Sequence, residues 1–434
     1  RAGIGMVHQH FMLVPTLTVA ENVALADEPV KLGGMVFDRD RAEEGVTKLS
    51  AQYGLSLDPR AKVADLSVGE QQRLEILKVL YRGAEILILD EPTAVLTPQE
   101  TTAFFEILKI LQSQGKTVIL ITHKLREVMA VSQGITVMRQ GKSVGSVKTK
   151  DTSESELAQM MVGRPVLFQV KRTVRKPDEI AQMPVALKLE NVTAKSARGL
   201  PALQGLSLDI RAGEIFGLAG VEGNGQTELI EVIAGLLRPD AGQVEFCGTQ
   251  IKLDSVTADE MLTRGLGHIP EDRHKRGMVL DYAVHENMVL GRHREPQFSN
   301  VFKMNFAGIR AFAGGLVQDY DVRPPDIELK ARYFSGGNQQ KVVVGRELSR
   351  KPKLLIAAQP TRGVDVGAIE LIHKKIIDAR DSGAAVLLVS AELPEILSLS
   401  DRVGVIYRGK IAAVFPVGDV TEEKLGLLMA GAHG

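Results

Sequence analysis

The chain has 434 residues, which is enough for two or three domains that each bury a core of their own. Its 53 basic and 53 acidic side chains balance, so bulk charge does not indicate nucleic acid or an anionic membrane surface as a partner. The single cysteine, Cys247, excludes an internal disulfide, and no apolar run reaches the roughly 18 residues that span a bilayer, so we expect membrane association only through a partner.

Short apolar runs alternate with amphipathic ones in the first half of the chain. The runs EILILD (85–90) and TVILIT (117–122) predict strands, because they are β-branched and almost continuously apolar, as parallel strands buried on both faces are. Amphipathic stretches predict helices at 71–83 and 98–115. The alternation predicts an α/β fold with a mainly parallel sheet and helical crossovers.

The first of these strands ends in LDEPT, and its two carboxylates are the most specific signal in this half. Asp90 and Glu91 would reach the C-terminal edge of the sheet, where doubly wound sheets bind ligands. Asp90 would hold Mg²⁺ through water, and Glu91 would act as the general base on an attacking water. Gln9 would reach the metal and the water, and His123, after the next strand, would hydrogen-bond a γ-phosphate. Each residue alone is common at a strand end, so it is the set that indicates a nucleotide site.

The run LSVGEQQ (66–72) precedes the predicted helix at 71–83. Ser67 and Gly69 would present a hydroxyl and backbone N–H groups at a helix N-terminus to a γ-phosphate. A single Ser-x-Gly helix cap is common, and the function is favoured here because the pattern recurs at FSGGNQQ (334–340). The residues expected to bind nucleotide in that second copy are Ser335, Gly336, Gly337 and Gln339.

A polar stretch at 163–184, with prolines and no clear period, joins the two halves. We expect a first domain over 1–168, a linker over 169–185 and a second domain over 186–434.

Between a predicted strand at 214–220 and a predicted helix at 227–237 lies GVEGNGQT, residues 220–227. It matches the phosphate-loop pattern G-x-x-x-x-G-K-[ST] except that Gln226 replaces the lysine. Glycines let backbone N–H groups approach phosphates, and the helix N-terminus adds a favourable field. The nucleotide-binding residues expected in this loop are Gly220, Gly223, Asn224, Gly225, Gln226 and Thr227.

The second half repeats the first at a spacing of 268 residues, from the runs LSVGEQQ and FSGGNQQ to the ends of the two copies. The repeat predicts strands at 353–358 and 385–390. Upstream, GIGMVHQ (3–9) corresponds to GLGHIPE (265–271) at a spacing of 262. By this repeat, roughly 75 residues with a first phosphate loop would precede residue 1, and the first domain is expected to be incomplete.

The second copy departs from the expected pattern at five positions of its own nucleotide site. Besides Gln226 for the phosphate-loop lysine, the replacements are Glu271 for Gln9, Ala358 for Asp90, Gln359 for Glu91 and Ala391 for His123. The lost lysine removes a charge worth about 4 kcal/mol near a phosphate at an effective dielectric of 20. A lost general base should cost about 10² to 10⁴ in rate, and an amide cannot accept the proton. We therefore expect the site of the second copy to be non-hydrolytic.

These motifs in this order resemble a tandem ABC transporter ATPase over the whole chain. Two segments, MVHQHFMLVPTLTVAENVAL and IAAQPTRGVDVGAIELIH, resemble the bacterial import ATPases of the nucleoside and simple-sugar group, with the nucleoside branch closer. The resemblance implies two ABC-type P-loop domains, each with a parallel sheet and a helical signature subdomain, and ATP with Mg²⁺ as cofactors. It also implies two transmembrane permeases, an indirect extracytoplasmic substrate-binding protein, no nucleic acid, and a peripheral position at the cytoplasmic face of the bacterial inner membrane.

In such proteins the two units pair head to tail, and each phosphate loop faces the signature motif of the other unit. The resemblance then implies a hydrolysing site that joins Gln9, Asp90, Glu91 and His123 to Ser335 and Gly337. A degenerate site would join the loop at 220–227 to Ser67 and Gly69.

Two alternatives stay open at this point. Soluble tandem ABC ATPases act on ribosomes or DNA, but they usually keep two hydrolysing sites and often carry long charged linkers or basic arms. An inactive fragment is the other reading, since the sequence is expected not to hydrolyse ATP appreciably alone. The transported solute is selected by the permease and the binding protein, so this sequence does not identify it.

Overall fold

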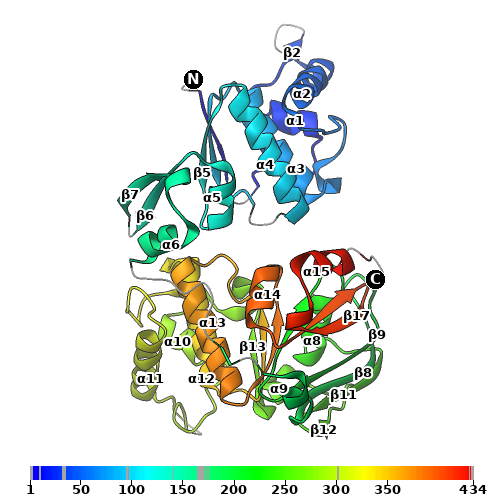
Figure 1. The fold of residues 1–434 in the computed structure, drawn as a ribbon, viewed down its shortest axis with the longest axis vertical. Helices are drawn as coiled ribbons and strands as arrows, with labels where there is room; N and C mark the ends of the chain where they lie inside the picture. Colours follow the sequence, from blue (N-terminus) through cyan, green and yellow to red (C-terminus); the bar gives the residue numbers. More distant parts are fainter. Residues whose placement is uncertain are drawn as a thin grey trace. The chain divides into compact units, whose positions relative to one another are not determined.

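The computed structural model describes residues 3–8, 11–31, 36–93, 96, 98–139, 141–163, 172–173, 175–300, 303–429 and 431. The chain forms two compact units, residues 1–166 and 167–434, which Figure 1 shows in blue to green and in green to red. Both units combine parallel strands with covering helices, so the predicted α/β class is confirmed. No helix among these residues is long and apolar enough to cross a lipid bilayer.

The first unit is built on a parallel sheet with the strand order β1-β4-β5. Its strands are β1 (Ile4–Val7), β4 (Ile86–Asp90) and β5 (Thr117–Ile121), and the last two are those predicted from the apolar runs. Two hairpins add β2 (Val30–Lys31) with β3 (Val36–Phe37) and β6 (Gly134–Arg139) with β7 (Lys142–Lys148). The helices are α1 (Val19–Ala24), α2 (Arg39–Tyr53), α3 (Val68–Tyr81), α4 (Pro98–Ser113), α5 (Leu125–Val131) and α6 (Glu154–Val162).

The second unit has a six-stranded sheet in the order β13-β14-β15-β10-β16-β17, parallel except for β17. Its strands are β13 (Leu266–Ile269), β14 (Leu354–Ala358), β15 (Ala385–Val389), β10 (Ile215–Ala219), β16 (Arg402–Tyr407) and β17 (Lys410–Pro416). A separate antiparallel sheet holds β12 (Thr249–Gln250), β11 (Ala241–Phe246), β8 (Val185–Lys195) and β9 (Pro201–Arg211). The helices are α7 (Pro177–Ala181), α8 (Gln226–Ile233), α9 (Ala258–Arg264), α10 (Val284–Met288), α11 (Phe306–Asp319), α12 (Gly336–Ser349), α13 (Val366–Asp381), α14 (Leu393–Leu399) and α15 (Glu422–Met429).

The six-stranded sheet is covered on both faces, which explains its continuously apolar strands. Successive residues of β14 alternate between two cores, with Ile356 in the core shared with α8 and the antiparallel sheet, and Leu355 in the core shared with α12 and α13. Figure 1 shows the antiparallel sheet in green, apart from the yellow and orange helices α11, α12 and α13. All residues of β10, β14 and β15 are buried, as expected for a parallel sheet covered on two sides.

Two of the helix boundaries that differ from the sequence prediction have local explanations. Helix α3 begins at Val68, before the predicted start, because Ser67 caps it and forms a reciprocal capping box with Glu70. Helix α8 ends at Ile233, before the predicted end at 237, because the chain turns at Gly235, whose φ is 68°.

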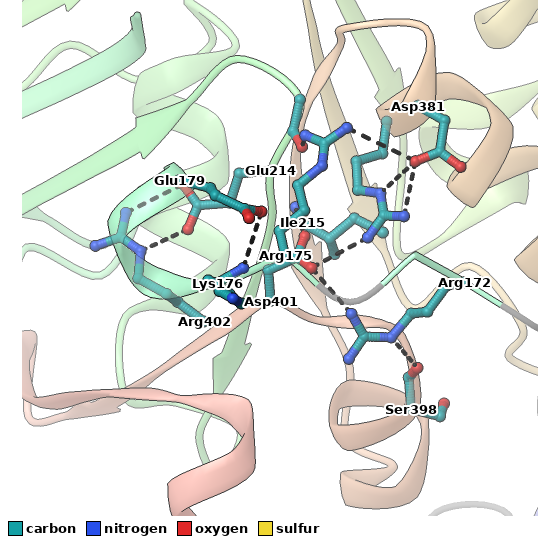
Figure 2. A network of polar contacts seen from close by, with 12 residues as sticks. Arg172, Arg175, Lys176, Glu179, Glu214, Ile215, Asp381, Ser398, Asp401 and Arg402 are labelled. Atoms are coloured by element: carbon teal, nitrogen blue, oxygen red, sulfur yellow. Dashed lines mark hydrogen bonds and ion pairs between the residues drawn. The ribbon is translucent and has the colours of Figure 1, made fainter. Parts of the chain in front are cut away.

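The described part of the segment predicted as a linker packs against the second unit, and it contains α7, which begins with a favourable N-terminal proline. Arg172 donates from Nη1 to Asp401 Oδ1 at 2.9 Å, and Arg175 donates to the carbonyl of Gly213. Asp401 also pairs with the fully buried Arg380 at 3.0 Å. Figure 2 shows the guanidinium of Arg172 directed at Asp401, which immediately precedes β16, and Arg175 beside Asp381.

Candidate functional site

The two carboxylates predicted to act on ATP lie at the C-terminal edge of the first unit's sheet. Asp90 is the last residue of β4 and aligns with Ile121 of β5. Its carboxylate is partly exposed and makes no hydrogen bond to the residues that the structure describes. Glu91 follows in a left-handed conformation with φ 43°, and its N–H donates to the carbonyl of Ile121 at 2.8 Å. Non-glycine residues rarely adopt this conformation, and here the backbone hydrogen bond to β5 helps to hold it.

Glu91 and His123 contact each other directly. The distance between Glu91 Oε1 and His123 Nδ1 is 3.0 Å, and both side chains are about three-quarters buried. The hydrogen bond to His123 lowers the pKa of Glu91, against an opposing effect of burial. Glu91 is therefore ionised at neutral pH and able to accept a proton. Gln9, the remaining predicted member of this set, lies outside the described residues.

A buried hydrogen bond between a threonine and a glutamate joins the segments that carry Glu91 and His123. Thr93 Oγ1 donates to Glu127 Oε1 at 2.5 Å, and Thr122 Oγ1 donates to Glu127 Oε2 at 3.3 Å. Glu127 thereby connects the turn after Glu91 to the residue before His123. Sequence reasoning missed Glu127, although its spacing from His123 recurs in the second unit as the spacing of Glu395 from Ala391.

The second unit keeps the same backbone arrangement with different side chains. Gln359 has φ 48°, and its N–H donates to the carbonyl of Val389 at 2.7 Å, as Glu91 does to Ile121. Its amide Oε1 accepts from the N–H of Ala391 at 3.2 Å, at the position of His123. Ala358 is buried at the position of Asp90. The loop geometry is thus retained without a carboxylate or an imidazole.

The hydrogen bond between threonine and glutamate is also retained in the second unit. Thr361 Oγ1 donates to Glu395 Oε1 at 2.7 Å, which repeats the contact between Thr93 and Glu127. His373 adds a 2.8 Å contact from Nε2 to the same oxygen, at the position that Phe105 occupies in the first unit.

The predicted phosphate loop, residues 220–227, connects β10 to α8 and bends through two glycines. Gly223 and Gly225 have φ of 88° and 105°, and a Cβ on Gly225 would lie 2.6 Å from the carbonyl of Ala202. Asn224 holds the loop, because its Oδ1 accepts from the N–H of Arg408 at 2.8 Å. Gln226 donates from Nε2 to the carbonyl of Val221 at 3.0 Å, inside the same loop. Gly220 and Thr227 bound the loop, and Thr227 is exposed.

The two signature motifs each begin a helix, but the third residue after the serine differs in charge. In the first unit the Ser67 hydroxyl donates to Glu70 Oε2 at 2.8 Å, and this contact helps to lower the pKa of Glu70 after the larger effect of the Ser67 N–H. In the second unit Asn338 donates from Nδ2 to Ser335 Oγ at 3.0 Å. At this position the first motif therefore carries a carboxylate and the second an amide.

Both motifs also contain a glycine with little space for a side chain. A Cβ on Gly69 would lie 2.5 Å from Glu100 Oε1, and one on Gly337 would lie 3.1 Å from Asp365 Oδ2. Gly336 precedes it at the first position of α12, and Gln339 is buried, donating from Nε2 to the carbonyl of Ala331 at 3.0 Å. The N-terminus of α12 is therefore closely surrounded by side chains of its own unit.

The described residues hold no group of three His, Cys, Asp or Glu side chains that would form a metal cage. Mg²⁺ does not need one, because it usually keeps several waters and binds through one or two carboxylates together with substrate phosphates. The free carboxylate of Asp90 fits this mode of binding.

Comparisons with known proteins show which proteins this chain is similar to. Residues 1–94 and 203–362 match the ABC transporter family. The chain is 50% identical over 430 residues to the guanosine import ATP-binding protein NupO of Bacillus subtilis (strain 168), covering 99% of this chain and 82% of the relative. It is 47% identical over 431 residues to the nucleoside import ATP-binding protein NupA of Lactococcus lactis subsp. cremoris (strain MG1363), covering 99% and 83%. It is also 45% identical over 458 residues to the glucose import ATP-binding protein TsgD13 of Haloferax volcanii (strain ATCC 29605), covering 99% and 82%.

Proposed function

The chain belongs to the ABC transporter family, and from that premise we propose that it is the ATP-hydrolysing subunit of an importer that takes up nucleosides. Two similar relatives are named for guanosine and nucleoside import, and a slightly less similar one is named for glucose import. The coarser statement, an ATP-binding subunit of a nucleoside or sugar importer, follows from all three names. The nucleoside is the finer proposal.

The observation that carries the hydrolytic role is the Glu91–His123 pair at the C-terminal edge of β4 and β5. Glu91 would accept the proton of the attacking water, and His123 would orient Glu91 and contact the γ-phosphate. Asp90 and Gln9 would hold an Mg²⁺ that arrives with ATP and neutralises charge on its phosphates.

We further propose that hydrolysis takes place at one of the two nucleotide sites. In the family pairing, the carboxylates of the first unit act with a signature motif supplied by the second unit, namely Ser335, Gly336, Gly337 and Gln339. The other site would use the loop at 220–227 with Ser67 and Gly69. Gln359 lies in the conformation of Glu91, but a carboxamide does not accept the proton, so this site would bind nucleotide without hydrolysing it.

Partners and location follow from the same proposal. The subunit would bind two transmembrane permeases at the cytoplasmic face of the inner membrane, and an extracytoplasmic binding protein would deliver the solute to those permeases. The one phosphate-loop pattern within the 434 residues carries Gln226. We therefore propose that these residues by themselves release phosphate from ATP only slowly, which a steady-state phosphate assay on the purified chain would test.

Uptake by the assembled importer in proteoliposomes tests the proposed function. Labelled guanosine should accumulate when ATP is enclosed with the ATPase subunit, and labelled ribose and glucose should not. Uptake of a sugar alone would refute the nucleoside assignment. A Glu91→Gln variant that still transports guanosine at the normal rate would refute the role of Glu91.

A further inference from the structure

One segment of the second unit has no counterpart of equal length in the first. Between the positions that correspond to Gln9 and Leu13 the first unit has three residues, whereas the second unit has six, 272–277. They form a short π-helix, Arg273–Gly277, which follows Glu271. Asp272 caps it, accepting from the N–H groups of His274 at 2.9 Å and Lys275 at 3.0 Å. Short π-helical turns are frequent at functional sites.

The guanidinium of Arg273 lies between the signature motif and the loop that follows β14. Its Nη1 donates to the carbonyl of Arg362 at 3.0 Å, and its Nε donates to Gln339 Oε1 at 3.4 Å. A Cβ on Gly336 would lie 2.5 Å from Arg273 Nη2, so the guanidinium lies against the first residue of α12. One side chain thus fixes the start of the signature helix relative to the turn after Gln359.

Neighbouring residues anchor the same segment on two further elements. His274 Nε2 contacts Gln339 Oε1 at 2.8 Å, which doubles the connection to α12. Arg276 Nη2 donates to Glu231 Oε1 of α8 at 2.6 Å. Residues 272–277 therefore connect the phosphate-loop helix, the signature helix and the loop after β14 of the second unit.

The first unit makes a different connection at this place. The N–H of Met12 donates to Glu75 Oε1 at 2.6 Å, and Lys78 Nζ donates to the carbonyl of Met12 at 2.7 Å. Gln71, which corresponds to Gln339, instead donates from Nε2 to the carbonyl of Leu66 at 3.0 Å. The described contacts of Met12 thus reach the middle of α3, whereas those of Arg273 reach the first turn of α12.

We propose that Arg273 is a positioning residue of the ATPase, which holds Gly336 and Gly337 in the geometry that receives the terminal phosphate at the hydrolysing site. This inference rests on the proposed assignment of the second signature motif to that site. Arginine suits the role because its planar fork donates to two acceptors at once and keeps its charge, whereas lysine presents a single rotatable ammonium group. Small displacements of groups that hold a reacting phosphate cost rate even when binding is retained.

ATP turnover of the assembled importer, measured against ATP concentration, tests the proposal. Arg273→Ala should lower kcat by about tenfold or more while KM for ATP changes by less than about twofold. Arg273→Lys should restore only part of the loss. Lys275→Ala, an exposed change in the same π-helix, is the matched control and should leave kcat unchanged.

A double-mutant cycle with Gln339→Ala adds a second readout. If Arg273 acts through Gln339, the combined variant should lose much less than the product of the two single losses. A normal kcat in Arg273→Ala with only a lower unfolding temperature, or independent losses in the cycle, would overturn the proposal. Gly337→Asp distinguishes a failure of the Arg273 proposal from a failure of the proposed site assignment. A strong loss of turnover in Gly337→Asp with no effect of Arg273→Ala would refute only the role of Arg273. No loss in either variant would refute the assignment of the second signature motif to the hydrolysing site.

Discussion

The sheets of the two units have the same strand pairing over three strands but very different burial. In the first unit Ile119 and Ile121 of β5 are each 47% exposed, whereas the corresponding Leu387 and Val389 of β15 are 0% and 6% exposed. The difference arises because β15 pairs with β10 and packs under α8 and the antiparallel sheet, and the described part of the first unit has no such layer on that face. A continuously apolar strand therefore predicts that both faces of its sheet are covered. Among the described residues, only the second unit has a layer on each face.

The less buried sheet is the one that keeps the predicted catalytic side chains. The exposed sheet of the first unit carries the carboxylate and imidazole, and the fully covered sheet of the second carries Gln359 and Ala391 in the same backbone geometry. The turn conformation and the threonine–glutamate support are thus properties of the fold, and the chemistry depends on side chains added to it.

Removing the carboxylate should produce the largest difference between the two sites. Glu91→Gln should lower ATP turnover of the assembled importer by about 10² to 10⁴, because the general base is lost while the fold is kept. The matched change Gln359→Ala removes a hydrogen bond to Ala391 but no proton acceptor, and should change turnover by less than about threefold. Equal losses in both variants would show that the second site takes part in hydrolysis.

The signature glycines give the next largest contrast. Gly337→Asp should lower turnover by about 10², because it brings a negative charge and a side chain to the place where a γ-phosphate is to be stabilised. Gly69→Asp should keep measurable turnover, although its Cβ has less space than that at Gly337. The atom closest to the Gly69 Cβ is the end of the flexible Glu100 side chain, which can move aside, so the predicted order depends on the phosphate and not on local packing.

Two controls complete that experiment. Unfolding temperatures of both variants separate a folding defect from a catalytic one. Gln359→Glu should not rescue Gly337→Asp, since Gln226, Ala358 and Ala391 still leave the second site without its charges.

A third contrast concerns stability at corresponding positions. Asp401 and Arg380 are a fully buried ion pair, and Asp401 Oδ2 also accepts from the N–H of Ile215 at 2.9 Å. The first unit has an exposed Gln133 and a partly exposed Gln112 there, with Gln112 Nε2 donating to Gln133 Oε1 at 3.4 Å. Asp401→Asn should destabilise the second unit by about 1–3 kcal/mol, because it removes the charge that faces Arg172 and Arg380, while Asp381, 2.7 Å from Arg380 Nη2, keeps one countercharge in place.

Urea unfolding followed by hydrogen exchange in β10 and β14 measures this effect. Gln133→Ala, the matched change, should cost less than about 0.5 kcal/mol. A small effect of Asp401→Asn would mean that Arg172 and Arg380 find other partners or water.

Apolar runs and the internal repeat were enough to predict several strands and one pair of corresponding site residues. The strands at 85–90 and 353–358 were predictable because two-sided burial gives apolar runs, and the internal repeat identified Gln359 as the counterpart of Glu91. The left-handed conformation of Glu91 was not predictable, because it depends on a hydrogen bond to another strand. The contact between Arg172 and Asp401 joins residues 229 positions apart, and the π-helix at 273–277 lies in a stretch that is three residues longer than its counterpart in the first unit.

The smallest expected effect concerns the pH dependence of the Glu91–His123 contact. The folded-state pKa of Glu91 lies below the ordinary value of 4.5, mainly because of its hydrogen bond to His123. A lowered carboxylate pKa contributes stability that is fully present above the unfolded-state value and is lost as the pH falls through the folded-state value. His123→Ala should therefore destabilise the first unit at pH 6 to 7, and the difference from the unchanged protein should shrink below about pH 4.

The corresponding change in the second unit, Ala391→Gly, alters no titrating contact, because Gln359 does not ionise. Its effect on unfolding should therefore be the same at both pH values. Unfolding free energies from urea titrations of both variants across this pH range make the measurement, and a difference for His123→Ala that grows as the pH falls below 4 would contradict the assignment of an ionised Glu91.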